Sequence, residues 1–495
     1  MQSSCLVFSG HMPDLMRDLP RFPAAMVPAA TARFSQWLTG IEHIGHYHCI
    51  ISCAAGADIL FAEAAFKAGC ELHIFLPCSE ELFIKQSIKP FESEGADWEK
   101  RFKALLAKAT VHKSEFPLVG ENPDFAKCNR QMADFAKSNY KNIYPVVFLK
   151  AENVHKPGGT EDFEALLSKA GHKVVNLYDA RLDPANLKLT SDELKEWIPA
   201  FSEVDNTAVE NQTIWHGRLR NSMLVLAAVI ILGRLESLRP HDFWGYAPII
   251  KVIGLITVLI GAILETSHIP HDKVRLRNWI TSRARAEQIR NFMWQYLFNL
   301  DLEGRHRTVS LKDFEEFLRR IGVITTRINP EEPEMSKLVL LNQPLSVRKA
   351  LYLKFRLHDQ ASYFNRKSAQ LKRKVKNLQR LRMIMLISGI VWGASRLYFA
   401  FFGHGHEPEI YESFNLLAVV VSMVVIIAGY QKSMNMEDLA FKYEQMYKRL
   451  KEEEKVLHEA HDQEAFHSVV FNTEELLRSQ NNEWVVNRET AKIGH

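Results

Sequence analysis

Three short loops in the first third of the chain combine small residues with hydroxyl, imidazole or acidic side chains, a chemistry suited to binding phosphate. Each loop follows an apolar run of strand-like length. Small residues let backbone amides approach a phosphate oxygen, and the positive end of a following helix favours the anion. A plain structural turn is the alternative for each loop, but three of them in one small domain favour a nucleotide-like ligand. The loops contain Ser9, Gly10 and His11; Ala54, Ala55, Gly56, Ala57 and Asp58; and Pro157, Gly158, Gly159 and Thr160.

Other polar residues in this region are candidate partners of the same ligand. Arg21 and Arg130 are candidate phosphate ligands, because a guanidinium can chelate two phosphate oxygens; a surface salt bridge is the alternative for each. Glu63 lies on the helix expected after the second loop. From this position it is a candidate to hydrogen-bond a ribose, as acidic residues do in dinucleotide-binding folds.

These loops need a scaffold that brings the ends of several strands together. Residues 1–180 alternate short apolar runs with amphipathic helical patterns, which predicts a parallel sheet covered by helices on both faces. Such a sheet binds its ligand at the carboxyl ends of the strands. The strand candidates are 4–9, 47–52, 71–77, 144–149 and 172–177.

Composition limits the function of this part of the chain. A net charge of +4 over 495 residues gives no support for nucleic-acid binding. The six cysteines include no C-x-x-C pair, and they are expected to be small buried residues in a reducing compartment. No basic segment followed by an apolar run opens the chain, so we expect no signal peptide and a cytosolic N-terminal part.

Two pairs of closely spaced histidines raise the question of a metal site. They are His46 with His48, and His404 with His406. A metal site needs three or four converging ligands, and no partner set is visible in the sequence. The sequence therefore predicts no metal site, and the histidines are expected in solvated loops.

The second half of the chain has a different character. A polar linker at about 182–212 precedes four apolar segments, at about 222–236, 246–264, 383–402 and 414–430. They predict two helical hairpins in an all-α membrane region with long cytosolic helices, within modules at 213–345 and 346–495. Several segments are shorter than the roughly 20 residues that cross a bilayer. Four buried helices of a soluble bundle are therefore the alternative.

The charges around these segments favour the membrane. Basic residues flank the first pair and precede the second, whereas the loop of the second pair carries Glu407, Glu409 and Glu412. This bias predicts a multi-pass protein of the cytoplasmic membrane with both termini in the cytosol. Three charges interrupt the segments. They lie either at helix ends, reaching the interface, or inside the membrane facing a water-filled lumen. The three are Arg234, Lys251 and Arg396.

Several short motifs in residues 1–180 resemble the SLOG superfamily, a Rossmann-like fold that includes cytokinin-activating LOG enzymes and bacterial nucleotide sensors. The motifs are S-G-H, R-F-P, A-A-G-A-D-I-L-F-A-E, C-N-R and P-G-G-T. The resemblance implies a nucleotide-binding domain over 1–181 and adds Asn129 to the candidate ligand residues. LOG enzymes carry P-G-G-x-G-T-x-x-E, whose glutamate helps to cleave an N-glycosidic bond. Here the x-G is missing, Phe163 stands where that glutamate is expected, and Glu161 and Glu164 are out of register. This departure favours binding, with Glu161 near the ligand, over hydrolysis.

The membrane half is similar to SLATT domains, two-helix membrane modules that accompany SLOG sensors and nucleotide cyclases in prokaryotic defence. The resemblance lies in a helix before the spans, a hairpin and a long following helix, and it is clearest at 363–368, 438–447 and 474–484. It implies an effector without catalytic residues or a cofactor. Its ligand would be a nucleotide-derived messenger made by a partner enzyme, and its homo-oligomer would breach the membrane. The alternatives are a membrane-anchored nucleotide hydrolase of the LOG type, with His11, Asp58 or Glu161 as acid or base, and a soluble scaffold.

Overall fold

The computed structural model describes residues 4–14, 21–92, 95–114, 116–119, 122–151, 157–235, 247–323, 328–402 and 416–490. The chain forms two compact units. Unit 1 is drawn from residues 1–188 and 330–348, and unit 2 from residues 189–329 and 349–495. The expected loop glutamates Glu407, Glu409 and Glu412, as well as His404 and His406, lie outside the described residues.

Unit 1 is built on a six-stranded, all-parallel sheet with the order β4-β3-β2-β1-β5-β6. The predicted strands are present, although the last is short, and the sequence reading missed β4. The short, half-exposed edge strand T-V-H-K lacks the apolar run that marks the other strands. The bounds are β1 Ser4–Gly10, β2 Tyr47–Ile51, β3 Glu71–Leu76, β4 Thr110–Lys113, β5 Asn142–Phe148 and β6 Val175–Asn176.

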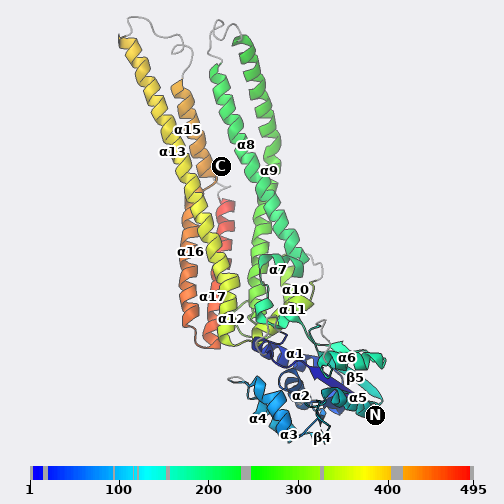
Figure 1. Cartoon of the computed structure of the whole chain (residues 1–495). Helices are drawn as coiled ribbons and strands as arrows, with labels where there is room; N and C mark the ends of the chain where they lie inside the picture. The colour runs from blue at the N-terminus through cyan, green and yellow to red at the C-terminus, as the bar shows by residue number, and fades with distance from the viewer. Residues whose placement is uncertain are drawn as a thin grey trace. The chain divides into compact units, whose positions relative to one another are not determined.

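Helices cover both faces of this sheet (Figure 1). Along β1, Phe8 stacks on Phe61 of α2 with ring centroids 3.9 Å apart, whereas its neighbour Val7 packs with Met132 of α5 and Phe163 of α6 in a second apolar core. Successive residues of a strand point to opposite faces, so one apolar strand serves both layers. The helices are α1 Val27–Thr39, α2 Ala57–Lys67, α3 Glu80–Phe83, α4 Trp98–Leu106, α5 Phe125–Asn139, α6 Thr160–Lys169 and α11 Glu331–Asn342.

The strand order creates a topological switch point in unit 1. From β1 the chain passes to β2, β3 and β4 on one side, and then returns to place β5 on the other side of β1. The loops after β1 and β5 therefore lie beside each other at the carboxyl edge of the sheet, and the chain continues from them toward opposite sides. In open parallel sheets this is where ligands bind.

Unit 2 is helical. α8 lies beside α9, and α13 lies beside both α15 and α16 (Figure 1). Residues 199–212, part of the expected linker, form the first turns of α8. The predicted fold class, a parallel sheet with helices followed by a mostly helical region with long apolar helices, is confirmed. The helices are α7 Ser191–Trp197, α8 Pro199–Leu235, α9 Ala247–Leu297, α10 Leu311–Arg320, α12 Leu345–Tyr352 (which crosses the boundary between the units), α13 His358–Phe402, α15 Leu416–Ser433, α16 Met436–Glu459 and α17 Gln463–Thr490.

Candidate functional site

The loops that follow β1 and β5 meet at the switch point of unit 1. Ser9 Oγ lies 3.4 Å from Thr160 Oγ1, at the start of α6. His11, which is 5% exposed, accepts a hydrogen bond at Nε2 from the Lys150 amide at 2.9 Å. The structure thus brings the first and third predicted loops together at one edge of the sheet.

Asp58 links the second predicted loop to the first. Its buried carboxylate accepts hydrogen bonds from the Gly10 amide at 2.8 Å and the Ala54 amide at 3.2 Å. Burial raises the pKa of Asp58 to about 7, and it outweighs these amide hydrogen bonds, which lower the pKa. The Asp58 carboxylate is directed at the protein backbone, so it holds the first and second loops in position relative to each other.

Close packing accounts for much of the glycine and alanine content of the first two loops. A Cβ at Gly10 would lie 2.5 Å from Ala57 Cβ, and one at Gly56 would lie 2.6 Å from Pro13 Cδ. The Ala55 amide donates to the Ser87 carbonyl at 3.0 Å, and the Ala57 amide donates to the His11 carbonyl at 3.1 Å. These amides are already used by the protein, so the small residues here support the site rather than surround a phosphate.

The third loop has a more open arrangement for an anion. α6 begins at Thr160, directly after Gly159, and no described side chain caps this end of the helix. Gly158 has a φ of +79°, and its amide donates to Asp162 Oδ2 at 3.0 Å. The amides at a helix start carry partial positive charge and lack intrahelical acceptors. Of the three loops, the one at 157–160 therefore has the local charge that suits an anion best, and phosphate binding there stays a prediction.

The start of α5 forms one wall beside this loop. A Cβ at Gly158 would lie 2.6 Å from Phe125 Cβ, and Asn129 Nδ2 approaches the Gly159 carbonyl oxygen at 3.5 Å. Asn129 is buried, whereas its neighbour Arg130 is exposed. Asn129 thus supports the loop, and Arg130 stands next to it on the surface of α5.

The remaining predicted residues are placed less directly. Glu63 forms a bidentate ion pair with Arg101 of α4, with distances of 2.8 Å from Nε to Oε1 and 2.6 Å from Nη2 to Oε2. Arg21 is half-buried and precedes Phe22, whose amide donates to Asp14 Oδ2 at 2.6 Å. Pro157 is exposed, and Glu161 lies half-buried in the first turn of α6. The roles of these residues toward a ligand stay predictions.

The apolar helices of unit 2 expose the side chains that a lipid environment would cover. Within the described residues, the stretches 345–402 and 416–459 are long and apolar enough to cross a membrane, and only 6% and 17% of their apolar windows are buried. Ile390 is 67% exposed and Val425 is 64% exposed. A core helix of a soluble bundle would bury such residues, so this exposure favours spans over the soluble alternative.

The other predicted pair of spans shows the same trend on α8 and α9, where Leu224 and Leu255 are each 62% exposed. Of the three charges in the predicted spans, Arg396 is exposed on α13. Arg234 lies in α8 and Lys251 in α9, and the placement of both side chains is outside what the structure describes. The two predicted placements of these charges, at an interface or facing a lumen, stay predictions.

Sequence reasoning missed a polar cluster at the other end of the strands. Glu71 and His73 of β3 lie near His48 of β2, and His112 of β4 follows. The signal was weak: two polar residues at alternate positions in the apolar strand E-L-H-I-F-L. Nothing in the linear sequence indicates that neighbouring strands align these histidines.

Comparison with known proteins gives one match. Residues 352–484 match the family described as SMODS and SLOG-associating 2TM effector domain 1, abbreviated SLATT_1. No curated protein and no solved structure matches the chain. The matched region begins at the end of α12 and includes α13, α15, α16 and most of α17. The second helical hairpin and the long helices that follow it are thus similar to a SLATT two-helix effector domain, which supports a membrane effector in a defence-related system.

Proposed function

We propose that the protein is a membrane effector of a prokaryotic defence system, gated by a nucleotide-derived second messenger. The observation that carries the proposal is the SLATT match over 352–484, which coincides with the exposed apolar faces of α13 and α15. In this proposal unit 1 is a SLOG-type head that binds the messenger, and a partner enzyme makes that messenger. The protein lies in the cytoplasmic membrane with both hairpins inserted and both termini in the cytosol.

The proposed ligand site is the carboxyl edge of the sheet. A phosphate group binds at the start of α6, at Gly159, Thr160 and Glu161, and Ser9 adds a hydroxyl from β1. Arg21 and Arg130 are the proposed cationic partners, and Glu63 is a proposed ribose partner. To bind a ribose, Glu63 has to release Arg101, with which it pairs in this structure.

The proposed output is permeabilisation of the membrane by an oligomer. Two helices cannot enclose a pore and four do not do so easily, so this model requires several chains to associate. Gly389 allows α13 and α15 to pack closely within one chain, because a Cβ there would lie 3.2 Å from Val420 Cγ1. Gly393 has no described atom within 4 Å of such a Cβ, which leaves a small residue where a helix of another chain can approach. The messenger acts by binding one association state more tightly than the other.

The test uses the full chain in liposomes that contain a trapped dye. Cyclic dinucleotides and ADP-ribose derivatives are added one at a time, and small molecules released from denatured protein are identified by mass spectrometry. We expect release only with a nucleotide that the protein binds, and loss of this release in Ser9→Asp, where the new carboxylate repels a phosphate. Ser138→Asp is the matched control, because Ser138 is exposed at the C-terminal end of α5. Release that no nucleotide changes, or equal release from both variants, would contradict the proposal.

A second candidate function is a membrane-anchored nucleotide N-glycosidase of the LOG type. The observation that supports this second candidate is Glu161, an acidic residue in the first turn of α6 beside the proposed phosphate site. Chromatography of the same nucleotides after incubation separates the two functions. Steady formation of free base, lost in Glu161→Gln, supports the glycosidase, and intact nucleotide together with dye release supports the effector.

A further inference from the structure

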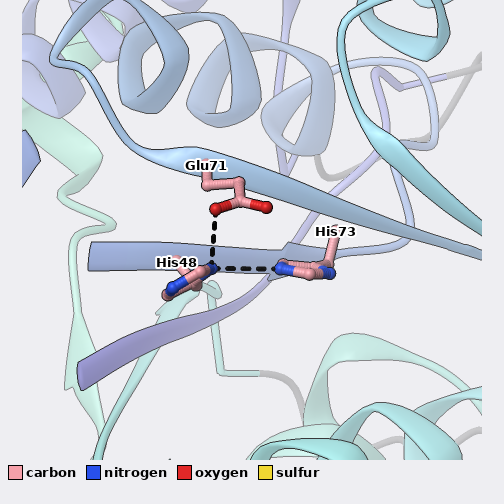
Figure 2. A group of neighbouring side chains, drawn as sticks. All are labelled: His48, Glu71 and His73. Carbon is pink, nitrogen blue, oxygen red and sulfur yellow. Dashed lines mark hydrogen bonds and ion pairs between the residues drawn. The ribbon is translucent and has the colours of Figure 1, made fainter. Parts of the chain in front are cut away.

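Three side chains from two neighbouring strands converge on one point in unit 1. Figure 2 shows the Glu71 carboxylate and the His73 ring both directed at the ring of His48. His48 Nδ1 lies 3.4 Å from Glu71 Oε2 and 3.1 Å from His73 Nε2. The three ligand atoms lie within 4.8 Å of one another.

The sheet register places these residues on one face. His48 is the register partner of Glu71, and His73 follows Glu71 by two residues, so all three point to the same side. This is the face covered by α5, since the His73 ring contacts Phe135 with centroids 5.3 Å apart. The cluster is therefore fixed by strand pairing.

Two further groups extend the cluster in the way that a metal site requires. Tyr140 Oη lies 3.3 Å from His73 Nε2, the same ring nitrogen that His48 approaches. The other ring nitrogen of His73, Nδ1, lies 3.1 Å from His112 Nε2. A histidine that binds a metal through one nitrogen usually has a hydrogen-bond partner on the other, which fixes its tautomer.

The distances fit tetrahedral coordination. Zinc bonds of about 2.0–2.1 Å place neighbouring ligand atoms about 3.3–3.4 Å apart. The contacts His48–His73, His73–Tyr140 and His48–Glu71 are 3.1, 3.3 and 3.4 Å. Glu71 and His73 lie within 4.8 Å of each other and have to approach more closely to share an ion. The Glu71 side chain has room for this movement because it is 62% exposed.

A network of hydrogen bonds can also join these atoms. In it the Tyr140 hydroxyl donates to His73 Nε2, His73 Nδ1 donates to His112, and His48 Nδ1 donates to Glu71. A cation at the centre instead takes the Glu71 carboxylate and one lone pair from each of the two imidazoles as ligands. Metal titration distinguishes the two arrangements.

We propose that His48, Glu71 and His73 bind a divalent transition-metal ion, with Zn²⁺ as the best match and Tyr140 or a water molecule as the fourth ligand. Two imidazoles and one carboxylate suit this class of ion, and the tetrahedral spacing favours zinc. The ligands lie toward the amino ends of β2 and β3, whereas the proposed nucleotide site lies at the carboxyl ends of β1 and β5. The metal site is therefore separate from the proposed nucleotide site and does not depend on it.

The test is a Co²⁺ titration of the full chain, purified in detergent without a polyhistidine tag and treated with a chelator. We expect one equivalent of Co²⁺ to give the intense visible absorption of tetrahedral cobalt, without the near-ultraviolet band of thiolate ligation, and Zn²⁺ to displace it. His73→Gln removes the visible band. His112→Leu keeps the ligands but weakens binding by about 10- to 100-fold.

Two variants keep the test decisive. Glu71→Gln removes a ligand at the exposed first residue of β3, where folding does not depend on the side chain, and it is expected to weaken binding. His46→Gln is the matched control, because His46 is exposed two residues before His48 and outside the cluster. The proposal is overturned if the wild-type chain gives no tetrahedral band, or if Glu71→Gln and His73→Gln bind Co²⁺ as His46→Gln does.

Discussion

The guanidinium of Arg356, just before α13, and the carboxylate of Glu474 in α17 form a buried bidentate ion pair. Arg356 Nε lies 2.9 Å from Glu474 Oε1, Nη2 lies 2.6 Å from Oε2, and each residue is 1% exposed. Tyr352 donates a further hydrogen bond to Glu474 Oε1 at 3.0 Å, and Asn291 of α9 accepts one from Arg356 at 2.5 Å. Both partners lie within the region that matches the SLATT family, and Asn291 extends their network to the preceding long helix.

Glu474→Gln is expected to destabilise unit 2 strongly, because it removes the carboxylate that forms the bidentate pair with the buried Arg356 guanidinium. Breaking one partner of a buried pair costs about 3–5 kcal/mol. Melting in detergent, followed by circular dichroism, should show a midpoint lowered on the order of 10 °C. Glu316→Gln, in the exposed pair with Arg320 on α10, is the control and should cost less than about 0.5 kcal/mol. Equal midpoints for the two variants would show that the buried pair is dispensable.

The exposed apolar face of α13 gives a second prediction. The six native cysteines are all buried in unit 1, so a single introduced cysteine can be labelled over a low background. Ile390→Cys should resist a membrane-impermeant maleimide in inverted membrane vesicles, whose cytosolic face points outward, and react after detergent is added, because lipid covers this position. Phe441→Cys, on α16 at 58% exposure, should react in both conditions. Equal labelling of both positions in membranes would argue against a span at 390.

Asp58 predicts a pH dependence for the stability of unit 1. Its pKa is about 7 in the folded chain, against an ordinary value of 3.8. Between these values the folded state retains a proton that the unfolded state releases, so stability falls as pH rises from about 4 to about 7. The full difference corresponds to up to about 4 kcal/mol. Asp58→Asn, which is neutral throughout, should lose this slope.

Urea unfolding detected by dithiodipyridine, which reacts with thiols even at acidic pH, can follow unit 1 within the full chain. Cys5 and Cys128 are buried, with at most 1% of either residue exposed, so the reagent reaches these thiols only when unit 1 opens. Parallel pH profiles for the wild type and Asp58→Asn would refute the assignment.

Two glycines with positive φ values differ in the space around them. Gly56 and Gly171 have φ values of +95° and +84°. A Cβ at Gly56 would meet Pro13 at 2.6 Å, whereas no described atom lies within 4 Å of one at Gly171. Gly171→Ala should therefore cost about 1 kcal/mol from conformation alone, and Gly56→Ala clearly more. The thiol assay measures both, and equal losses would mean that the loop adjusts without cost.

The sequence was sufficient for the sheet, because buried parallel strands are continuous apolar runs such as S-C-L-V-F-S, and for the long apolar helices. The sequence did not predict β4, because this edge strand is only half-buried and its residues T-V-H-K do not form an apolar run. The sequence also did not predict that Glu71 and His73 lie beside His48, since that contact depends on the register between β2 and β3. Similarly, Glu63 is a candidate ribose partner by position, and only the fold brings Arg101 to it.

Unit 1 is discontinuous in sequence, which determines when it can be completed during synthesis. α11 belongs to this unit, where Gln343 Nε2 donates to the Ala25 carbonyl at 3.2 Å and Arg181 Nη2 lies 2.8 Å from Glu331 Oε1. A ribosome has to translate residues 189–329, and with them α8 and α9, before it reaches α11. Unit 1 is therefore completed only after these long helices have been synthesised, and a product truncated before residue 330 lacks a part of its α/β unit.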